Sequence, residues 1–280
     1  METSIALGTF DGVHIGHRAV LESAAKHNNS IALAFSLPPK SFFSSDGIVI
    51  TDKQRKAELI KQIGIKKTVF LDFADVKDIS ATSFFEEVVK KYTPEYIYCG
   101  ENYTFGKNAS GNVELLAELC EKKGIKLNVC NSVLNDGVIV SSSYIRNLLK
   151  AGNIKNANEL LSSDFSFSAK VIHGDKRGRT IGFPTINQKY PKNCAEVKRG
   201  VYKSYIFFEN KKYDCISNIG IRPTYESNTV LCETYIKDFN SYLYGKNIRI
   251  FLKEFIREEK KFGGLDELKK AIENDLSFIK

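Results

Sequence analysis

The feature that most constrains this fold is a change in hydrophobic pattern part-way along the chain. In the first half, short apolar runs typical of buried strands alternate with segments whose apolar residues recur at helical spacing. The candidates are strands at residues 4–10, 31–37, 67–73, 96–100 and 126–133 and helices at 17–27, 53–64, 83–92 and 113–124. Strands separated by helices imply right-handed βαβ units, so we expect an open, Rossmann-like α/β sheet with ligands beyond the carboxyl ends of its strands.

The second half has a different pattern. After a helical stretch at 141–161, short β-rich runs broken by Gly, Asn and Pro lie at 169–174, 200–208, 212–220, 230–236 and 247–255. Such runs are typical of an antiparallel sandwich or barrel. One face of the last stretch forms an apolar stripe of an amphipathic helix: Leu265, Leu268, Ile272, Leu276 and Ile279. We expect two domains, an α/β domain at 1–157 and a mainly antiparallel β-barrel with a terminal helix at 158–280, because 280 residues can bury two cores.

The charge balance leaves the class of ligand open. The formal net charge is +8 and the pI is about 9.0, which suits either nucleic acid or small anionic substrates. The lysines are spread among glutamates and aspartates, which favours ordinary solvated helix faces for most of them. Net charge therefore does not decide the function.

The cysteines and the apolar runs bear on the compartment. Six cysteines occur singly without a CxxC pair, which argues against a structural zinc site and against disulfide staples. No apolar run approaches the length of a membrane span, and the N-terminal residues lack the pattern of a signal peptide. We therefore expect a cytoplasmic protein with reduced thiols and no membrane partner.

Two histidines stand at the first strand-to-helix turn, in the segment GTFDGVHIGH at 8–17. His14 and His17 are three residues apart, so they share one face of a helix whose free N-terminal N–H groups favour phosphate. Two imidazoles there can donate hydrogen bonds to phosphoryl oxygens, and Gly16 allows close approach of a nucleotide. The alternatives are capping or surface histidines, and a zinc site that would lack a third ligand.

Two later segments can also contact phosphate. Residues 100–107 superficially resemble a P-loop, but the spacing of the glycines and the residue after Lys107 do not fit that motif. Ser142 opens a helix in the segment SSSYIR and Arg146 follows one turn later. Serines at such positions are commonly caps, whereas the forked guanidinium donors of arginine suit polyphosphate.

Together, the segments GTFDGVHIGH, GENYTFGKNASG and SSSYIR resemble the adenylyltransferase module of bacterial bifunctional riboflavin kinase/FAD synthetases. The resemblance implies that His14 and His17 contact the ATP phosphates and that Ser142 and Arg146 hold the leaving pyrophosphate. It also implies further contacts to nucleotide or flavin phosphate, at Gly8, Phe10, Asp11, Gly16 and Asn102. One departure is Leu37-Pro38-Pro39-Lys40, which stands where these enzymes usually carry a Pro-His-Pro-like turn.

The second chemical segment is a glycine-rich loop at 173–184 followed by an extended stretch. Its glycines and cations describe a mobile loop able to lie over phosphates: Gly174, Lys176, Arg177, Gly178, Arg179 and Gly182. Thr185 and Asn187 are two apart, so on a strand both side chains face the same way, and their oxygens can share a Mg²⁺ that also binds ATP. The alternative is a glycine-rich surface hairpin before a conventional strand.

The companions of this loop resemble the riboflavin kinase module of the same enzymes. They are residues 199–202, 217–224, 243–246 and 256–262 and the segment CETYI around Glu233. The resemblance implies that Glu233 is the general base on the terminal ribityl hydroxyl and that Arg257 borders the flavin pocket. It further implies that ATP or flavin is bound at six positions of the loop: Gly174, Lys176, Gly178, Arg179, Gly182 and Pro184.

The resemblance as a whole implies an enzyme that phosphorylates riboflavin with ATP and then transfers AMP from ATP to FMN, giving FAD and pyrophosphate. Its expected ligands are riboflavin, FMN, FAD, ATP and Mg²⁺, without nucleic acid; the oligomeric state stays open. Three alternatives remain. Another HIGH-type nucleotidyltransferase would not explain the segment GFPTIN at 182–187, and a tRNA-ligating enzyme would need an anticodon-binding extension that is not evident. A non-catalytic flavin-binding regulator would be expected to lose Glu233, Thr185 or Asn187, and all three are present.

Overall fold

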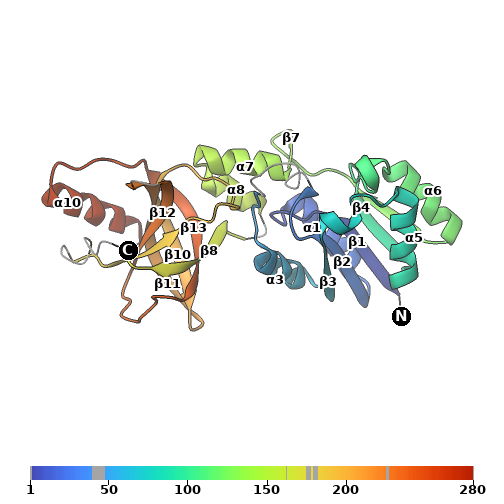
Figure 1. Ribbon diagram of the computed structural model, residues 1–280, viewed down its shortest axis with the longest axis horizontal. Helices are drawn as coiled ribbons and strands as arrows, with labels where there is room; N and C mark the ends of the chain where they lie inside the picture. The colour runs from blue at the N-terminus through green and yellow to red at the C-terminus, as the bar shows by residue number, and fades with distance from the viewer. Residues whose placement is uncertain are drawn as a thin grey trace. The chain divides into compact units, whose positions relative to one another are not determined.

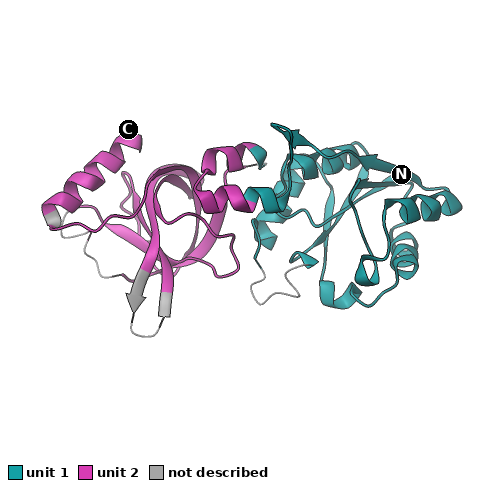
Figure 2. Ribbon diagram, turned by 90° about the horizontal axis from the view of Figure 1, so that it is seen from above, with its two compact units in different colours: residues 1–145, 160–162 teal, residues 146–159, 163–280 magenta. Residues whose placement is uncertain are grey.

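The computed structural model describes residues 2–39, 48–161, 163–174, 178, 182–224 and 227–279. The chain divides into two compact units, residues 1–145 with 160–162 and residues 146–159 with 163–280 (Figure 2). The expected domain boundary at 157/158 falls inside helix α8 (Ile154–Leu160). Among the helices in the described residues, none is both long enough and apolar enough to cross a bilayer.

The first unit contains a parallel five-stranded sheet in the order β3-β2-β1-β4-β5 (Figure 1). The strands are β1 (Thr3–Gly8), β2 (Asn29–Phe35), β3 (Lys67–Leu71), β4 (Tyr96–Gly100) and β5 (Lys126–Cys130). The helices are α1 (Ile15–Ala25), α3 (Lys53–Ile63), the short α4 (Phe73–Val76), α5 (Ala81–Tyr92) and α6 (Val113–Lys123), with a 3-10 turn η1 (Lys107–Ala109). All four strand pairs are parallel, which confirms the expected Rossmann-like α/β domain.

Helices cover both faces of this sheet, and the alternation of side chains along β1 shows why. Ile5 and Leu7 pack on one face with residues of α5 and α6, whereas Ala6 packs on the other with residues of α1 and α3. Because both faces are buried, the strands read as continuous apolar runs rather than as alternating ones.

The strand order reverses at β1, which pairs with β2 on one side and β4 on the other. In open α/β sheets, ligands bind at such a switch point, beyond the carboxyl ends of the strands. The segment that follows β1 carries His14 and His17, and the one that follows β4 carries Asn102. The topology therefore brings the two predicted segments to the same edge of the sheet.

Two short features follow β5. A hairpin of β6 (Leu134–Asn135) and β7 (Val138–Ile139) turns at Asp136-Gly137, where both residues have a positive φ. The helices α7 (Ser142–Ala151) and α8 come next. The sequence pattern predicted one helical stretch here but neither the hairpin nor α4, because these elements are too short to show a period.

The second unit is a closed antiparallel barrel in the order β10-β11-β12-β9-β8-β13. Its strands are β8 (Ser166–Ile172), β9 (Thr185–Lys189), β10 (Gly200–Phe208), β11 (Lys211–Thr224), β12 (Ser227–Ile236) and β13 (Asn247–Arg257). Closure gives each of the six strands a hydrogen-bonded neighbour on both sides, as in other small barrels. The expected barrel with a terminal helix is thus confirmed, since α10 (Leu265–Leu276) and a 3-10 turn η2 (Ser277–Ile279) follow β13.

The inside of the barrel holds a row of hydroxyl groups. Ser217 lies 2.7 Å from Ser204 on β10 and 2.8 Å from Thr234 on β12, measured between side-chain oxygens, and all three residues are fully buried. Each hydroxyl finds its partner on a neighbouring strand, which avoids the cost of an unsatisfied buried polar group. Such cross-strand bonds favour a single register in this part of the barrel.

Helix α10 is attached to the barrel by an apolar contact and an ion pair. Val201 and Ile216 pack with Ile279 from the chain end. The Arg257 guanidinium donates through Nε and Nη2 to both carboxylate oxygens of Asp275, at 2.9 and 2.7 Å. The Asp275 side chain is 6% exposed, whereas that of Arg257 is 31% exposed.

This ion pair is testable. Asp275→Asn should lower the free energy of unfolding by about 2 kcal/mol, less than for a fully buried pair because Arg257 is partly solvated. Thermal unfolding and amide exchange of residues 265–279 would measure the loss. Glu273→Gln, at an exposed position of the same helix, is the control, and equal stability of the two variants would contradict the role given to the pair.

Candidate active sites

The turn after β1 adopts a tight, partly left-handed backbone. Phe10, Gly12 and Val13 have φ values of 50°, 84° and 44°. Phe10 and Val13 are almost fully buried, so packing holds them in a conformation that is unfavourable for residues other than glycine. A Cβ at Gly8 would lie 2.8 Å from the Phe10 ring, which explains the glycine at the end of the strand.

Asp11 anchors this turn from inside the protein. Its side chain is buried, and Oδ1 accepts hydrogen bonds from the backbone N–H groups of Ile50 and Thr51 at 3.0 and 3.3 Å. The Asp11 carbonyl accepts a 2.9 Å bond from the Ser142 hydroxyl at the start of α7. Asp11 therefore has a structural role, and Ser142 is brought to the turn that carries the histidines.

The two predicted histidines lie face to face at the start of α1. Their rings stack with centroids 3.6 Å apart, and Phe10 meets His17 edge-on at 5.5 Å. His14 is the N-cap residue, and its Nδ1 accepts the His17 backbone N–H at 3.4 Å. A neutral His14 then carries its proton on Nε2, which makes that atom a hydrogen-bond donor. The ring also lies close to Gly16, where a Cβ would be 3.2 Å from Nδ1.

Burial keeps both imidazoles neutral. Desolvation lowers the pKa of His14 from 6.5 to about 4. The pKa of His17 is lowered well below its ordinary value by desolvation first and then by the neighbouring His14 and Lys56. Within the described residues, the buried Nδ1 of His17 has no hydrogen-bond partner. The pair can therefore donate to, or accept from, a ligand without changing its own charge near neutral pH.

The remaining predicted residues of the first half lie in the loop after β4 and on α7. Asn102 is exposed in the loop after β4, and its Oδ1 lies 3.5 Å from the position of a Cβ on Gly100. Ser141 rather than Ser142 caps α7, because its hydroxyl oxygen accepts the Tyr144 N–H at 3.2 Å. Arg146 is half-buried one turn after Ser142 on α7, in the stretch of that helix grouped with the second unit.

The glycine-rich loop is described in part. Lys176 and Arg179, as well as Lys40 of the Pro-Pro-Lys segment, lie outside the described residues. A Cβ at Gly174 would lie 2.4 Å from the Asn187 amide, and one at Gly178 would lie 2.3 Å from the Phe183 carbonyl oxygen. Both glycines therefore permit a close backbone approach.

The end of the loop is more open. Gly182 has a φ of 86° with open space around it, and Pro184 is exposed. Thr185 and Asn187 follow on β9, and because they are two residues apart their side chains lie on the same face of the strand, as their spacing predicted.

Strand register places the predicted polar residues of the barrel in one row. Asn187 on β9 pairs with Glu233 on β12, Glu233 with Asn218 on β11, Asn218 with Val201 on β10, and Val201 with Arg257 on β13. Directly paired residues have their side chains on one face of a sheet. Thr185, two residues before Asn187, extends the same face. The row lies opposite the buried hydroxyls, so it is on the outer face of the barrel.

Asn218 is a member of this row that no individual motif singled out. Its Nδ2 donates to Glu259 at 3.4 Å, while its buried Oδ1 has no hydrogen-bond partner among the described residues. A buried acceptor of this kind is rare in folded proteins and is suited to a ligand or a water molecule. Its signal in the sequence was only its place in the segment 217–224.

Arg257, at the end of the row, makes several contacts with its neighbours in the chain. Besides Asp275, it donates through Nη1 to the Glu258 carbonyl, and its guanidinium lies 5.7 Å from the centroid of the Phe262 ring. These contacts hold the side chain in place at the end of the row. The pair with Asp275 anchors α10 to the barrel. Contact of Arg257 with a flavin stays a prediction.

Comparison with known proteins decides the family. A family model described as FAD synthetase matches residues 1–144, and one described as riboflavin kinase matches residues 161–280. The bifunctional riboflavin kinase/FMN adenylyltransferase of Buchnera aphidicola (subsp. Schizaphis graminum) is 33% identical over 99% of this chain and 93% of its own length. That of Escherichia coli K12 is 31% identical over 97% and 90%. The chain belongs to the bifunctional riboflavin kinase/FMN adenylyltransferases.

This family assignment confirms the activities that the motifs predicted: the protein is an enzyme with riboflavin kinase and FMN adenylyltransferase activity. A solved structure is also similar over the full length. A Streptococcus pneumoniae protein named as a macrolide-efflux protein has a TM-score of 0.89 and 26% identity, covering 99% of this chain and 93% of that one. The two units therefore occur together in a related chain.

The low pKa of His14 in this enzyme predicts a pH-dependent stability. The unfolded chain binds a proton at His14 below pH 6.5, whereas the folded chain binds it only near pH 4. The folded state is therefore fully favoured above pH 6.5, and stability falls between pH 6.5 and about 4, by up to about 3 kcal/mol for this residue. Urea unfolding of residues 1–145 within the full chain, followed from neutral pH to about pH 5, would measure this slope.

The control compares two substitutions of the same kind. His14→Asn keeps a capping side chain and should flatten the slope, whereas His27→Gln should keep it, because His27 lies away from this turn and contacts Glu2 and Tyr98. An unchanged slope in His14→Asn would show that His14 is not a source of the pH dependence.

Proposed function

We propose that residues 1–157 transfer AMP from ATP to FMN and that residues 158–280 phosphorylate riboflavin. The observation that carries this division is the presence of two separate sets of polar groups. Stacked imidazoles at a helix N-terminus stand at the switch point of the α/β sheet, and Thr185, Asn187 and Glu233 share one face of the barrel. Each set lies within a single compact unit.

In the reaction assigned to residues 1–157, a phosphate oxygen of FMN would attack the α-phosphorus of ATP. A new P–O bond forms, the bond between the α-phosphorus and its bridging oxygen to the β-phosphate breaks, and pyrophosphate leaves. No protein nucleophile is needed, so catalysis depends on positioning and on charge stabilisation. The Nε2–H of His14, the ring of His17 and the free N–H groups of α1 would bind phosphoryl oxygens. Ser142 and Arg146 would hold the pyrophosphate.

In the second unit, the terminal ribityl hydroxyl of riboflavin would attack the γ-phosphorus of ATP. Glu233 would accept the hydroxyl proton as the new P–O bond forms, and ADP leaves as the old bond breaks. Asn187 lies beside Glu233 on the neighbouring strand, so the base and the groups that hold the phosphates come from adjacent positions of one sheet. Gly174, which permits a close backbone approach beside Asn187, would let the chain pass close to the phosphates there.

The residues of the barrel fit a magnesium ion. A hydroxyl oxygen at Thr185 and an amide oxygen at Asn187 are hard ligands on one face of β9, and Mg²⁺ usually keeps few protein ligands beside water and substrate phosphates. Among the described residues there is no cluster of three His, Cys, Asp or Glu side chains that would favour a softer metal. When bound, Mg²⁺ would neutralise charge on the ATP phosphates. We expect the enzyme to act in the cytoplasm, a reducing compartment in which the thiols of its six cysteines would stay reduced.

Single substitutions test the division between the two sites. Asn187→Ala should abolish FMN formation from riboflavin and leave FMN-to-FAD conversion intact, because it removes an oxygen ligand from one phosphate site only. His17→Ala should do the reverse. Chromatography of flavins after incubation with Mg-ATP measures both reactions in one sample.

Matched controls come from exposed or distant residues of the same types. Asn247→Ala, at an exposed strand end of the barrel, and His27→Ala, at the opposite edge of the α/β sheet, should leave both reactions unchanged. Equal loss of both reactions in folded Asn187→Ala or His17→Ala would refute the separation. Replacement of Mg²⁺ by a chelator should stop FMN formation in the parent enzyme.

A further inference from the structure

Helix α3 contains a lysine whose burial is unusual. Lys56 has no exposed surface, although the neighbouring Lys53 and Lys61 on the same helix are exposed. Lysine is almost never fully buried unless its ammonium group has partners, because removal of a charge from water is costly. The partners of Lys56 therefore indicate what the residue does.

Those partners are two backbone carbonyls at the carboxyl edge of the sheet. Lys56 Nζ donates to the Phe35 oxygen at 2.8 Å and to the Thr9 oxygen at 3.2 Å. Phe35 is the last residue of β2, and Thr9 is the first residue after β1. One ammonium group thus joins the ends of two neighbouring strands at the start of the turn that carries His14 and His17.

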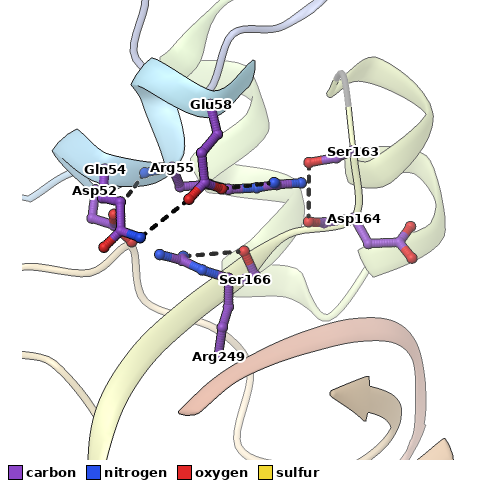
Figure 3. A network of polar contacts seen from close by, with 8 residues as sticks. All are labelled: Asp52, Gln54, Arg55, Glu58, Ser163, Asp164, Ser166 and Arg249. Carbon is purple, nitrogen blue, oxygen red and sulfur yellow. Dashed lines mark hydrogen bonds and ion pairs between the residues drawn. The ribbon is translucent and has the colours of Figure 1, made fainter. Parts of the chain in front are cut away.

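Residues 50 and 51, in the segment before α3, hold the same turn at a second point. Ile50 and Thr51 donate to Asp11, and the next residue, Asp52, caps α3 by accepting the Arg55 N–H at 2.9 Å. Figure 3 shows this cap together with the pairs from Gln54 and Arg55 to Glu58. Helix α3 is therefore capped by contacts other than those of Lys56, and its Leu59 and Ile60 pack in the core beneath the sheet face that α1 also covers.

We propose that Lys56 is a positioning residue for adenylyl transfer, which fixes the strand ends at Thr9 and Phe35 and thereby the placement of the two histidines. The inference rests on the proposed assignment of this reaction to residues 1–157. Lys56 acts through the turn, without contact to the substrate.

The charges around Lys56 support this role. Burial lowers the pKa of Lys56 to about 8, and the nearby carboxylate of Asp11 opposes part of this shift because it favours the charged ammonium group. Lys56 in turn contributes to the low pKa of His17. The ammonium charge therefore favours the neutral imidazole that the phosphate site uses, in addition to holding the backbone.

Lys56→Met tests the proposal, because methionine fills similar volume without the donors. We expect kcat for FMN-to-FAD conversion to fall roughly 100-fold, the effect of a small misplacement of catalytic groups, while the KM values for FMN and ATP change by less than about threefold. Riboflavin phosphorylation should be unchanged. Lys61→Met on the exposed side of α3 is the matched control and should retain both activities.

A merely structural role would instead lower the melting temperature while folded protein kept its kcat. A folded Lys56→Met variant with parental kcat for FAD formation would therefore overturn the proposal. His17→Ala separates this failure from failure of the proposed function. If His17→Ala loses FAD formation but Lys56→Met does not, the site stands and the inference about Lys56 is wrong; if neither loses it, the site itself is misassigned.

A measurement on the unsubstituted enzyme keeps the proposal testable if Lys56→Met does not fold. Brief acetylation of the native full-length protein followed by mass spectrometry should modify Lys53 and Lys61 and spare Lys56. Modification of Lys56 at the rate of Lys61 would show that its ammonium group is not held between the two carbonyls, and would overturn the proposal.

Discussion

The buried carboxylate of Asp11 is the interaction on which the adenylyltransferase site depends. A turn with left-handed residues at Phe10 and Val13 is unfavourable by itself, so surrounding contacts must hold it. Asp11 supplies them, because its carboxylate accepts hydrogen bonds from the backbone N–H groups of residues 50 and 51 and its carbonyl accepts one from the Ser142 hydroxyl. Segments far apart in the chain meet at this residue, and the histidine pair is positioned as a consequence.

In the barrel, the register of the strands positions the predicted site residues. Asn187, Glu233 and Asn218 stand side by side because β9, β12 and β11 pair at those residues, and a shift by one residue would turn each side chain to the opposite face. The buried hydroxyl row of Ser204, Ser217 and Thr234 on the other face opposes such a shift. The residues proposed for the kinase reaction are thus positioned by strand pairing, whereas those proposed for adenylyl transfer are positioned by a turn that Asp11 holds.

Periodicity and short motifs predicted the fold class, the strand-to-helix turn with its histidines, and the shared face of Thr185 and Asn187, because these are local properties. The row that links Asn187 to Arg257 depends on pairing between distant strands, which spacing does not reveal. The sequence did not predict the burial of Lys56 for a related reason. A lysine in an amphipathic helix is expected to be solvated, and only the packing of α3 against the ends of β1 and β2 shows that this side chain is buried. The Asp275 partner of Arg257 was missed in the same way.

The two sites handle phosphate charge with different groups. As proposed, the first site would bind phosphate through neutral imidazoles, a hydroxyl and helix N–H donors, and burial lowers the pKa of His14 to about 4, so this imidazole keeps its charge around neutral pH. The second would combine a carboxylate base, Glu233, with the hard oxygen ligands of β9. Acidification should therefore reach FAD formation only near the pKa of His14, about 4, where protonation of this buried imidazole would also destabilise the turn that carries it.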